Sequence, residues 1–181
     1  ALMTSVIHNP SKVAEYILSS RKMQIEILPP DINFGESEFS ADHGAIRYGL
    51  SAIKSLGAPM IRAIVEERNE NGKYQSLRDF IERMSGRELN KRAIENLIKA
   101  GALDQVAGNR RQKLMVYAEI VDAVNQEKKN AMTGQMSLFD LISDEEKEAY
   151  EIQMPKVEEY SKEELLSFEK EVLGVYISGH P

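Results

Sequence analysis

The 181-residue sequence predicts a mainly α-helical fold with a small β-hairpin, a flexible acidic linker and a C-terminal helix. Three observations support this fold class. Strand-like patterns occupy parts of residues 25–50, short helical segments separated by single glycines follow Gly49, and regular patterning stops after about Met132. Apolar residues make up 42% and charged residues 29%, which is normal for a globular protein. The length allows one ordinary domain or two small ones.

The N-terminal part contains one predicted helix over residues 10–22. Asn9 supplies a capping side chain, and the ring of Pro10 fixes the backbone angle that the first helical residue needs. The apolar positions expected to share one face are Val13, Ile17 and Leu18.

Extended backbone is expected next. Residues 25–32 alternate apolar and polar side chains until Pro29 and Pro30, which indicates a short edge strand or an extended connector. Residues 39–50 are typical of a small β-hairpin, with Gly44 at the turn position that needs a positive φ angle.

A run of helices separated by tight turns follows the hairpin. Ser76 and Asp79 have the spacing of a capping box, with a hydroxyl followed three residues later by a carboxylate. The expected helix starts are Ser51, Ala58, Ser76, Asn90 and Asn109. The last of these helices is long, and its predicted core stripe is Leu114, Ala118, Val121 and Val124.

The C-terminal part begins with a predicted mobile linker, because residues 132–160 lack periodicity and include an acidic stretch from Asp144 to Glu151. A second capping box, Ser161 with Glu164, opens the last helix, which is expected to end at Gly174. Residues 175–177 resemble the beginning of a strand. The expected buried stripe of this helix is Leu165, Phe168 and Val172.

The net charge of −6 hides an uneven distribution along the chain. Residues 1–43 carry 3 basic and 6 acidic side chains, residues 44–114 carry 14 and 8, and residues 115–181 carry 6 and 15. A basic block between acidic flanks favours a phosphate-facing surface, because local potential decides which ligands are attracted. The alternative is an ordinary solvated surface of mixed charge.

The first candidate site is a glycine turn that leads into a helix and resembles a helix-hairpin-helix motif. Backbone amides at such a turn, together with the helix dipole, suit a phosphate oxygen, so DNA binding would be independent of sequence and sensitive to salt. Ser55 stands where the motif usually has its first glycine, and an ordinary αα-hairpin is the alternative. The candidate residues are Lys54, Ser55, Leu56, Gly57, Ala58 and Arg62.

A second copy of this scheme follows, and it strengthens the prediction of a tandem helix-hairpin-helix domain that binds double-stranded DNA. An apolar helix from Asn90 leads to a turn of small residues around a glycine, and another helix follows. The candidate residues here are Lys99, Ala100, Gly101, Ala102, Arg110 and Arg111.

A third candidate site lies in the predicted linker and resembles the bacterial sliding-clamp-binding peptide. A glutamine can enter a polar subsite while an adjacent leucine and phenylalanine fill an apolar pocket. The alternative is a linker hydrophobe that folds back on the helices. The residues are Gln135, Met136, Ser137, Leu138 and Phe139.

Other chemistry has little support in the sequence. There is no cysteine, and the three histidines are scattered. Asp31 to Gly35 lacks the remaining oxygen ligands of a calcium loop, and no phosphate-binding P-loop is present. We therefore expect no catalytic residue, metal site or cofactor in this segment. No apolar run is long enough for a membrane span and no signal peptide is evident, so a cytoplasmic location is expected.

The order of these pieces resembles the C-family of bacterial replicative polymerases, the DNA polymerase III alpha subunits. The stretches that carry the resemblance are Ile27–Asn33, Ile46–Lys54, Leu97–Asp104, Glu169–Tyr176 and Ser178–Pro181. Because the chain begins without an initiator Met and stops just after a new element starts, we expect it to be a piece of a longer protein.

The resemblance implies four regions: residues 1–43 as the end of the fingers and a connector, 44–131 as the tandem helix-hairpin-helix domain, 132–160 as a linker with the clamp-binding peptide, and 161–181 as a helix with the start of an oligonucleotide-binding fold. The catalytic palm, which would use Mg²⁺, would lie upstream in a DNA-directed DNA polymerase. The implied partners are primer–template duplex, the sliding clamp (beta subunit) and the rest of the polymerase chain within the replicase holoenzyme. The alternatives are a helix-hairpin-helix module of a repair nuclease or ligase, and a protein-interaction scaffold without DNA binding.

Overall fold

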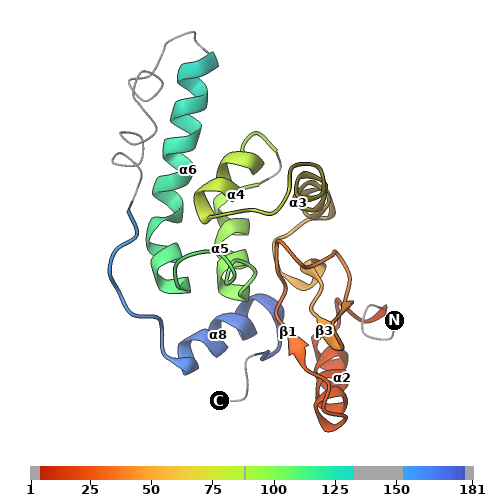
Figure 1. The fold of residues 1–181 in the computed structure, drawn as a ribbon. Coiled ribbons are helices and arrows are strands. Elements are labelled where there is room, and N and C mark those ends of the chain that lie inside the picture. The colour runs from red at the N-terminus through yellow and green to blue at the C-terminus, as the bar shows by residue number, and fades with distance from the viewer. Residues whose placement is uncertain (1–4, 88, 133–152, 178–181) are drawn as a thin grey trace.

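The computed structural model describes residues 5–87, 89–132 and 153–177 (Figure 1). Over these residues it has six α-helices and a small three-stranded sheet, which confirms the predicted mainly α fold class. The helices are α2 (Pro10–Lys22), α3 (Ala58–Asn71), α4 (Leu77–Met84), α5 (Lys91–Ala100), α6 (Arg110–Met132) and α8 (Lys162–Leu173), with a 3₁₀ turn η1 (Leu50–Ala52) before α3.

The sheet contains the predicted hairpin and one added strand. β2 (Ser40–Asp42) pairs antiparallel with β3 (Ala45–Arg47), and β1 (Ile27–Leu28) pairs parallel with β3 on its other side. The two turn residues, His43 and Gly44, have φ angles of 49° and 85°, as the tight turn of a two-residue hairpin requires. β1 is therefore an edge strand, as the paired prolines that follow it predict.

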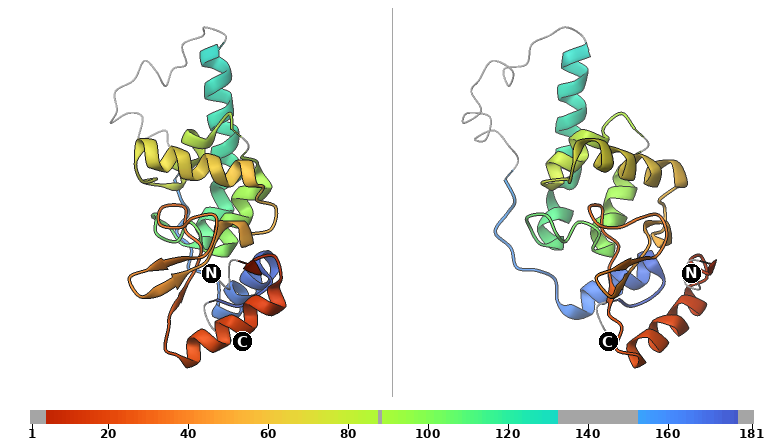
Figure 2. Two further views of the ribbon diagram at one scale, coloured as in Figure 1. Left: turned by 90° about the vertical axis from the view of Figure 1, so that its right-hand side faces the viewer. Right: turned by 45° about the vertical axis from the view of Figure 1, so that its right-hand side comes forward.

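The helical core is built around α5. This helix packs against α6 on one side and α8 on another, and α4 packs on α6 further along (Figure 1). Ile94, Leu97 and Ile98 of α5 are almost completely buried. The start of α2 lies beside the end of α8 (Figure 2), where an added Cβ on Gly174 would lie 2.8 Å from the ring of Pro10.

A loop after β1 joins the sheet to the helices. The amide of Ile32 donates to the carbonyl of Ala102, and Asn33 exchanges two hydrogen bonds with the backbone of Tyr74. Arg68 of α3 donates to the carbonyls of Ile32 and Gly35. These bonds and the β1–β3 pairing cross the boundary expected near residue 43, so the strands and helices share one hydrophobic core.

Most predicted helix caps are present. Asn9, Ser76, Asn90 and Ser161 each accept a hydrogen bond from the first turn of the helix they precede. The capping box at Ser161 is complete. The predicted box at Ser76 is only half formed, because the carboxylate of Asp79 accepts from the amide of Gln75 rather than from that of Ser76.

Two predicted elements are wrong. No α-helix starts at Ser51, because residues 50–52 form only a 3₁₀ turn that ends at the extended residue Ile53. Residues 175–177 form bends and no strand, and the amide of Ile177 bonds to the carboxylate of Glu169. Part of the predicted mobile linker is also packed, since residues 153–160 lie along the start of α6.

The predicted buried faces are shifted at several positions. Leu18 is 49% exposed, because α2 packs on the core mainly through Val13 and Ile17, with Ala14 and Tyr16 at the edge of the contact. In α8, Leu166 is fully buried while Leu165 and Phe168 are half-buried. The long helix α6 buries Val116, Ile120 and Val124, whereas the predicted Leu114, Ala118 and Val121 lie at the edges of that stripe.

Candidate nucleic-acid interface

The first predicted turn, residues 54–58, is hydrogen-bonded to the helices on one side and exposed to solvent on the other. The amide of Lys54 donates to the carbonyl of Val172, and its own carbonyl accepts from Asn96 of α5. Leu56 points into the core, while Ser55 and Gly57 are exposed. The turn is therefore fixed on α5 and α8 while its glycine faces solvent.

Ser55 takes over the conformational role of the missing first glycine. Its φ angle is 67°, in the left-handed region that serine rarely adopts. Gly57, by contrast, has an extended φ of −77° that any residue can adopt. What favours a small residue at 57 is the open approach to the helix that follows it.

The N-terminus of α3 has no side-chain cap. Gly57 is its N-cap residue, Pro59 contributes no N–H group, and the first intrahelical bond runs from Ile61 to the carbonyl of Gly57. Each of the other five described α-helices has a capping side chain, with Asn109 serving α6. The amides of Ala58 and Met60 at the start of α3 thus have no acceptor among the described side chains.

Most basic side chains of residues 44–114 form ion pairs or hydrogen bonds within the protein. Over the described residues, eight of its basic side chains form ion pairs, and the ammonium of Lys113 bonds to two carbonyls. Arg83, for example, donates to Glu67, and this hydrogen bond lowers the pKa of that carboxyl although burial opposes it. Apart from Lys113, the cations of the block that form no ion pair with a described residue are Lys54, Arg62, Lys73, Arg92 and Arg111.

Three of these five cations lie on the elements that form or hold the open turn. Lys54 belongs to the turn, and Arg62 lies one helical turn into α3. Arg92 lies one turn before Asn96 on α5, on the face that bonds to the carbonyl of Lys54. All three side chains are exposed. Sequence reasoning missed Arg92, because only the Asn96 contact shows which part of α5 lies beside the turn.

The second predicted turn is closed. Gly101 ends α5 in the left-handed conformation, with a φ angle of 87°. Its amide donates to the carbonyl of Ile98, and the amide of Ala102 donates to that of Leu97, so both donors complete the end of α5. Ala100, Gly101 and Ala102 are all buried. These amides can reach a phosphate only if the C-terminal turn of α5 opens.

The cations predicted beside this turn are also engaged. Lys99 bonds to Glu95 and Glu171. Arg110 is buried between Asp104 and Glu169 and donates to the carbonyl of Lys99. Burial alone would lower the pKa of Arg110, but the two carboxylates outweigh it and raise the pKa. Arg110 therefore ties α5, α6 and α8 together.

Arg111 is the cation near the second turn that stays accessible. Its guanidinium carbon lies 5.8 Å from the ring centre of Tyr160, and the side chain is exposed. It begins α6 together with Arg110, after a glycine, Gly108, with a φ angle of 98°. The second glycine turn that leads into a helix is thus at residue 108 and not at residue 101.

Comparison with known proteins identifies one family model and several related polymerase subunits. A family model for the helix-hairpin-helix motif matches residues 24–113. The DNA polymerase III subunit alpha of Borreliella burgdorferi is 39% identical over 181 residues, that of Thermus aquaticus 38% over 181, and that of Chlamydia trachomatis 37% over 182. Each match covers the whole chain.

The chain belongs to the DNA polymerase III alpha subunit family. It spans only 14–16% of the length of these three relatives. It is therefore a segment of a polymerase of this family that contains a helix-hairpin-helix region, and the expected resemblance is confirmed.

The predicted clamp-binding residues of this family segment, Gln135 to Phe139, lie outside the described residues. Within residues 5–87, 89–132 and 153–177, no three His, Asp or Glu side chains come together in a way that could hold a metal ion. The same part of the chain includes no helix that is long and apolar enough to cross a membrane.

Proposed function

We propose that this segment holds duplex DNA without reading its sequence, through the open turn at residues 54–58. The observation that carries the proposal is the exposed glycine turn before α3, whose helix-terminal amides have no capping side chain. A phosphate oxygen placed there would accept from these amides and align with the positive end of the helix dipole.

The surrounding charges support a phosphate ligand. Lys54, Arg62 and Arg92 are exposed cations from three different elements, and none of them is neutralised by a described carboxylate. Neighbouring phosphates of one strand can therefore meet a side-chain cation on either side of the amide contact. Because every nucleotide carries the same phosphate, such contacts would bind any DNA sequence with similar affinity. The polymerase could therefore move along its template without losing them.

Within the parent polymerase we assign the segment a non-catalytic role. It would hold the primer–template duplex while a palm elsewhere in the chain performs nucleotidyl transfer with Mg²⁺, in the cytoplasm where bacterial DNA is copied. Gln135, Met136, Ser137, Leu138 and Phe139 would tether the polymerase to the sliding clamp. Two weak attachments on one chain raise the effective concentration of each other's ligand, which favours processive synthesis.

A binding titration with the chain tests the DNA contact. Lys54→Glu with Arg62→Glu should weaken binding of every duplex sequence alike and reduce the slope of log K against log salt by about 2, since two phosphate contacts are lost. Lys22→Glu with Lys162→Glu is the matched control, because it makes the same charge change at the last residue of α2 and the first residue of α8, the helix ends that lie away from the turn. Equal losses in both variants, or a loss confined to some sequences, would contradict amide-to-phosphate binding at this turn.

The clamp tether is tested separately. Leu138→Ala with Phe139→Ala should abolish binding to purified clamp and leave duplex affinity unchanged, because the aromatic and aliphatic anchors supply most of the energy of such short contacts. Leu141→Ala with Ile142→Ala removes similar apolar area just beyond the motif and should leave clamp affinity intact. The tether hypothesis is wrong if the first variant still binds the clamp normally.

A further inference from the structure

The start of α6 holds an anion that belongs to the chain itself. One carboxylate oxygen of Glu159 accepts from the amide of Arg110 at 3.0 Å. The other oxygen accepts from the amides of Arg111, at 3.2 Å, and Tyr160, at 2.9 Å. Three backbone N–H groups thus surround one carboxylate at the positive end of a helix.

These amides are the ones that the local cap leaves open. Asn109 and Gln112 form their own reciprocal cap, with the Gln112 amide donating to Asn109 Oδ1 and the Asn109 amide donating to Gln112 Oε1, both at 2.8 Å. The two amides between them, those of Arg110 and Arg111, have no intrahelical acceptor. Glu159 is therefore bound at a place where the turn presents donors outward.

This turn shares parts with the open turn at α3. A glycine stands just before each helix: Gly57 is the N-cap residue of α3, and Gly108 precedes Asn109, which caps α6. In both turns, an exposed arginine belongs to the first turns of the helix, Arg62 or Arg111. The α6 turn differs because it has its own side-chain cap and because an anion accepts from its remaining amides.

The segment that brings this carboxylate, residues 153–160, covers the turn from outside. Asn109 and Gln112 donate from their side chains to the carbonyls of Val157 and Pro155, at 3.1 and 2.8 Å. The side chain of Met154 lies against Gly108 and leaves no room for a Cβ there. Glu159 itself is exposed, so another anion can replace its carboxylate without opening the core.

We propose that the start of α6 is a second phosphate site of the duplex grip and that Glu159 occupies it as an internal substitute for phosphate, which DNA displaces on binding. The inference rests on the proposed function and extends it, since it assigns the second contact to residues 108–111 and gives that contact a built-in competitor. A tethered carboxylate is present at high effective concentration, so it weakens a phosphate contact at this turn by competition.

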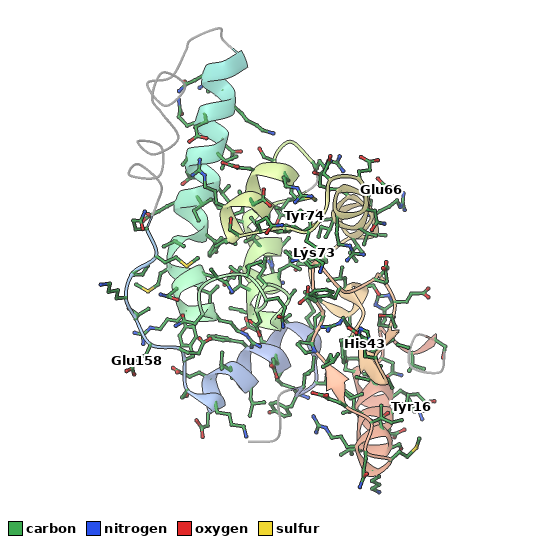
Figure 3. All side chains as sticks on the ribbon, in the orientation of Figure 1. Tyr16, His43, Glu66, Lys73, Tyr74 and Glu158 are labelled. Carbon is green, nitrogen blue, oxygen red and sulfur yellow. The ribbon has the colours of Figure 1, made fainter. Side chains whose placement is uncertain are left out.

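Duplex titrations of three forms of the chain test the proposal: the unchanged chain, Glu159→Gln and Glu158→Gln. The neighbouring Glu158 is exposed on the outer edge of the same segment (Figure 3), so its variant makes the same charge change without touching the amides. Removal of the competitor should tighten duplex binding roughly threefold to tenfold beyond the Glu158→Gln effect, as the energy of an anion at a helix N-terminus implies. The slope of log K against log salt should become steeper by about 1, because the protein contacts one more phosphate.

A second measurement follows the site directly. In amide NMR spectra of Glu159→Gln, inorganic phosphate should shift the signals of Arg110 and Arg111 with saturation, and the unchanged chain should need a higher concentration for the same shift. The proposal is overturned if the two variants bind duplex equally, or if these amides do not respond to phosphate in the variant. If no form binds duplex at low salt, it is the proposed function that fails; the amide response to phosphate then still decides whether Glu159 covers an anion site.

Discussion

Glu169 holds the junction of α5, α6 and α8, so its removal should destabilise the chain far more than removal of a surface acid on the same helix. Its carboxylate is fully buried, accepts from the amide of Ile177 at 3.1 Å, and lies 3.4 Å from two guanidinium nitrogens of Arg110. Arg110 keeps its two short bonds to Asp104 when Glu169 is lost, so it is not left as an unpaired buried charge.

The magnitude follows from these contacts. An unsatisfied Ile177 amide costs about 1–3 kcal/mol. The loss of the long contacts to Arg110 adds to this, but stays below the ~3–5 kcal/mol of a charge left without a partner. We therefore expect Glu169→Ala to lower the free energy of unfolding by about 3 kcal/mol, which for a chain of this size is a fall of roughly 6–12 °C in Tm.

Urea unfolding followed by circular dichroism measures this change, with Glu171→Ala as the control. Glu171 lies two residues further along α8, its side chain is 58% exposed, and it pairs with Lys99 at 3.2 Å, so its loss should cost less than about 1 kcal/mol. Equal costs for the two variants would refute the reasoning that burial makes the Glu169 junction strong.

Three further predictions concern the frame that positions the site. Ser161→Ala should lower the free energy of unfolding by about 1 kcal/mol through loss of the α8 cap, measured by urea unfolding. Gly174→Ala should cost clearly more than Gly44→Ala in the same assay, because both glycines have φ near 80–85° but only Gly174 meets another side chain, that of Pro10. Burial lowers the pKa of Lys113 below its ordinary 10.5. The unfolded chain therefore binds more protons between these two pKa values, and stability relative to Lys113→Met should rise as pH increases toward 10.5. A flat difference between urea curves at about pH 7.5 and about pH 10.5 would contradict this linkage.

Local signals in the sequence determined the helix starts and the hairpin. Asn9, Ser76, Asn90 and Ser161 cap the helices they were predicted to cap, because a short polar side chain bonds to amides only two or three residues away. The turn at Gly44 likewise depends on neighbouring residues alone. The spacing of Gly57 before an apolar helix also placed the open turn correctly on the surface.

Only the tertiary structure decided which turn has exposed amides and which basic side chains form no ion pair with the described residues. Gly101 is a predicted hairpin glycine, but its amide and that of Ala102 complete the end of α5, whereas the amides after Gly108 bond to Glu159, some fifty residues away along the chain. Arg110 has the same charge as Arg92, yet long-range carboxylates bury one and leave the other exposed. Charge and capping signals in a sequence reach only one helical turn, whereas the competition for donors and cations is settled by residues that folding brings together.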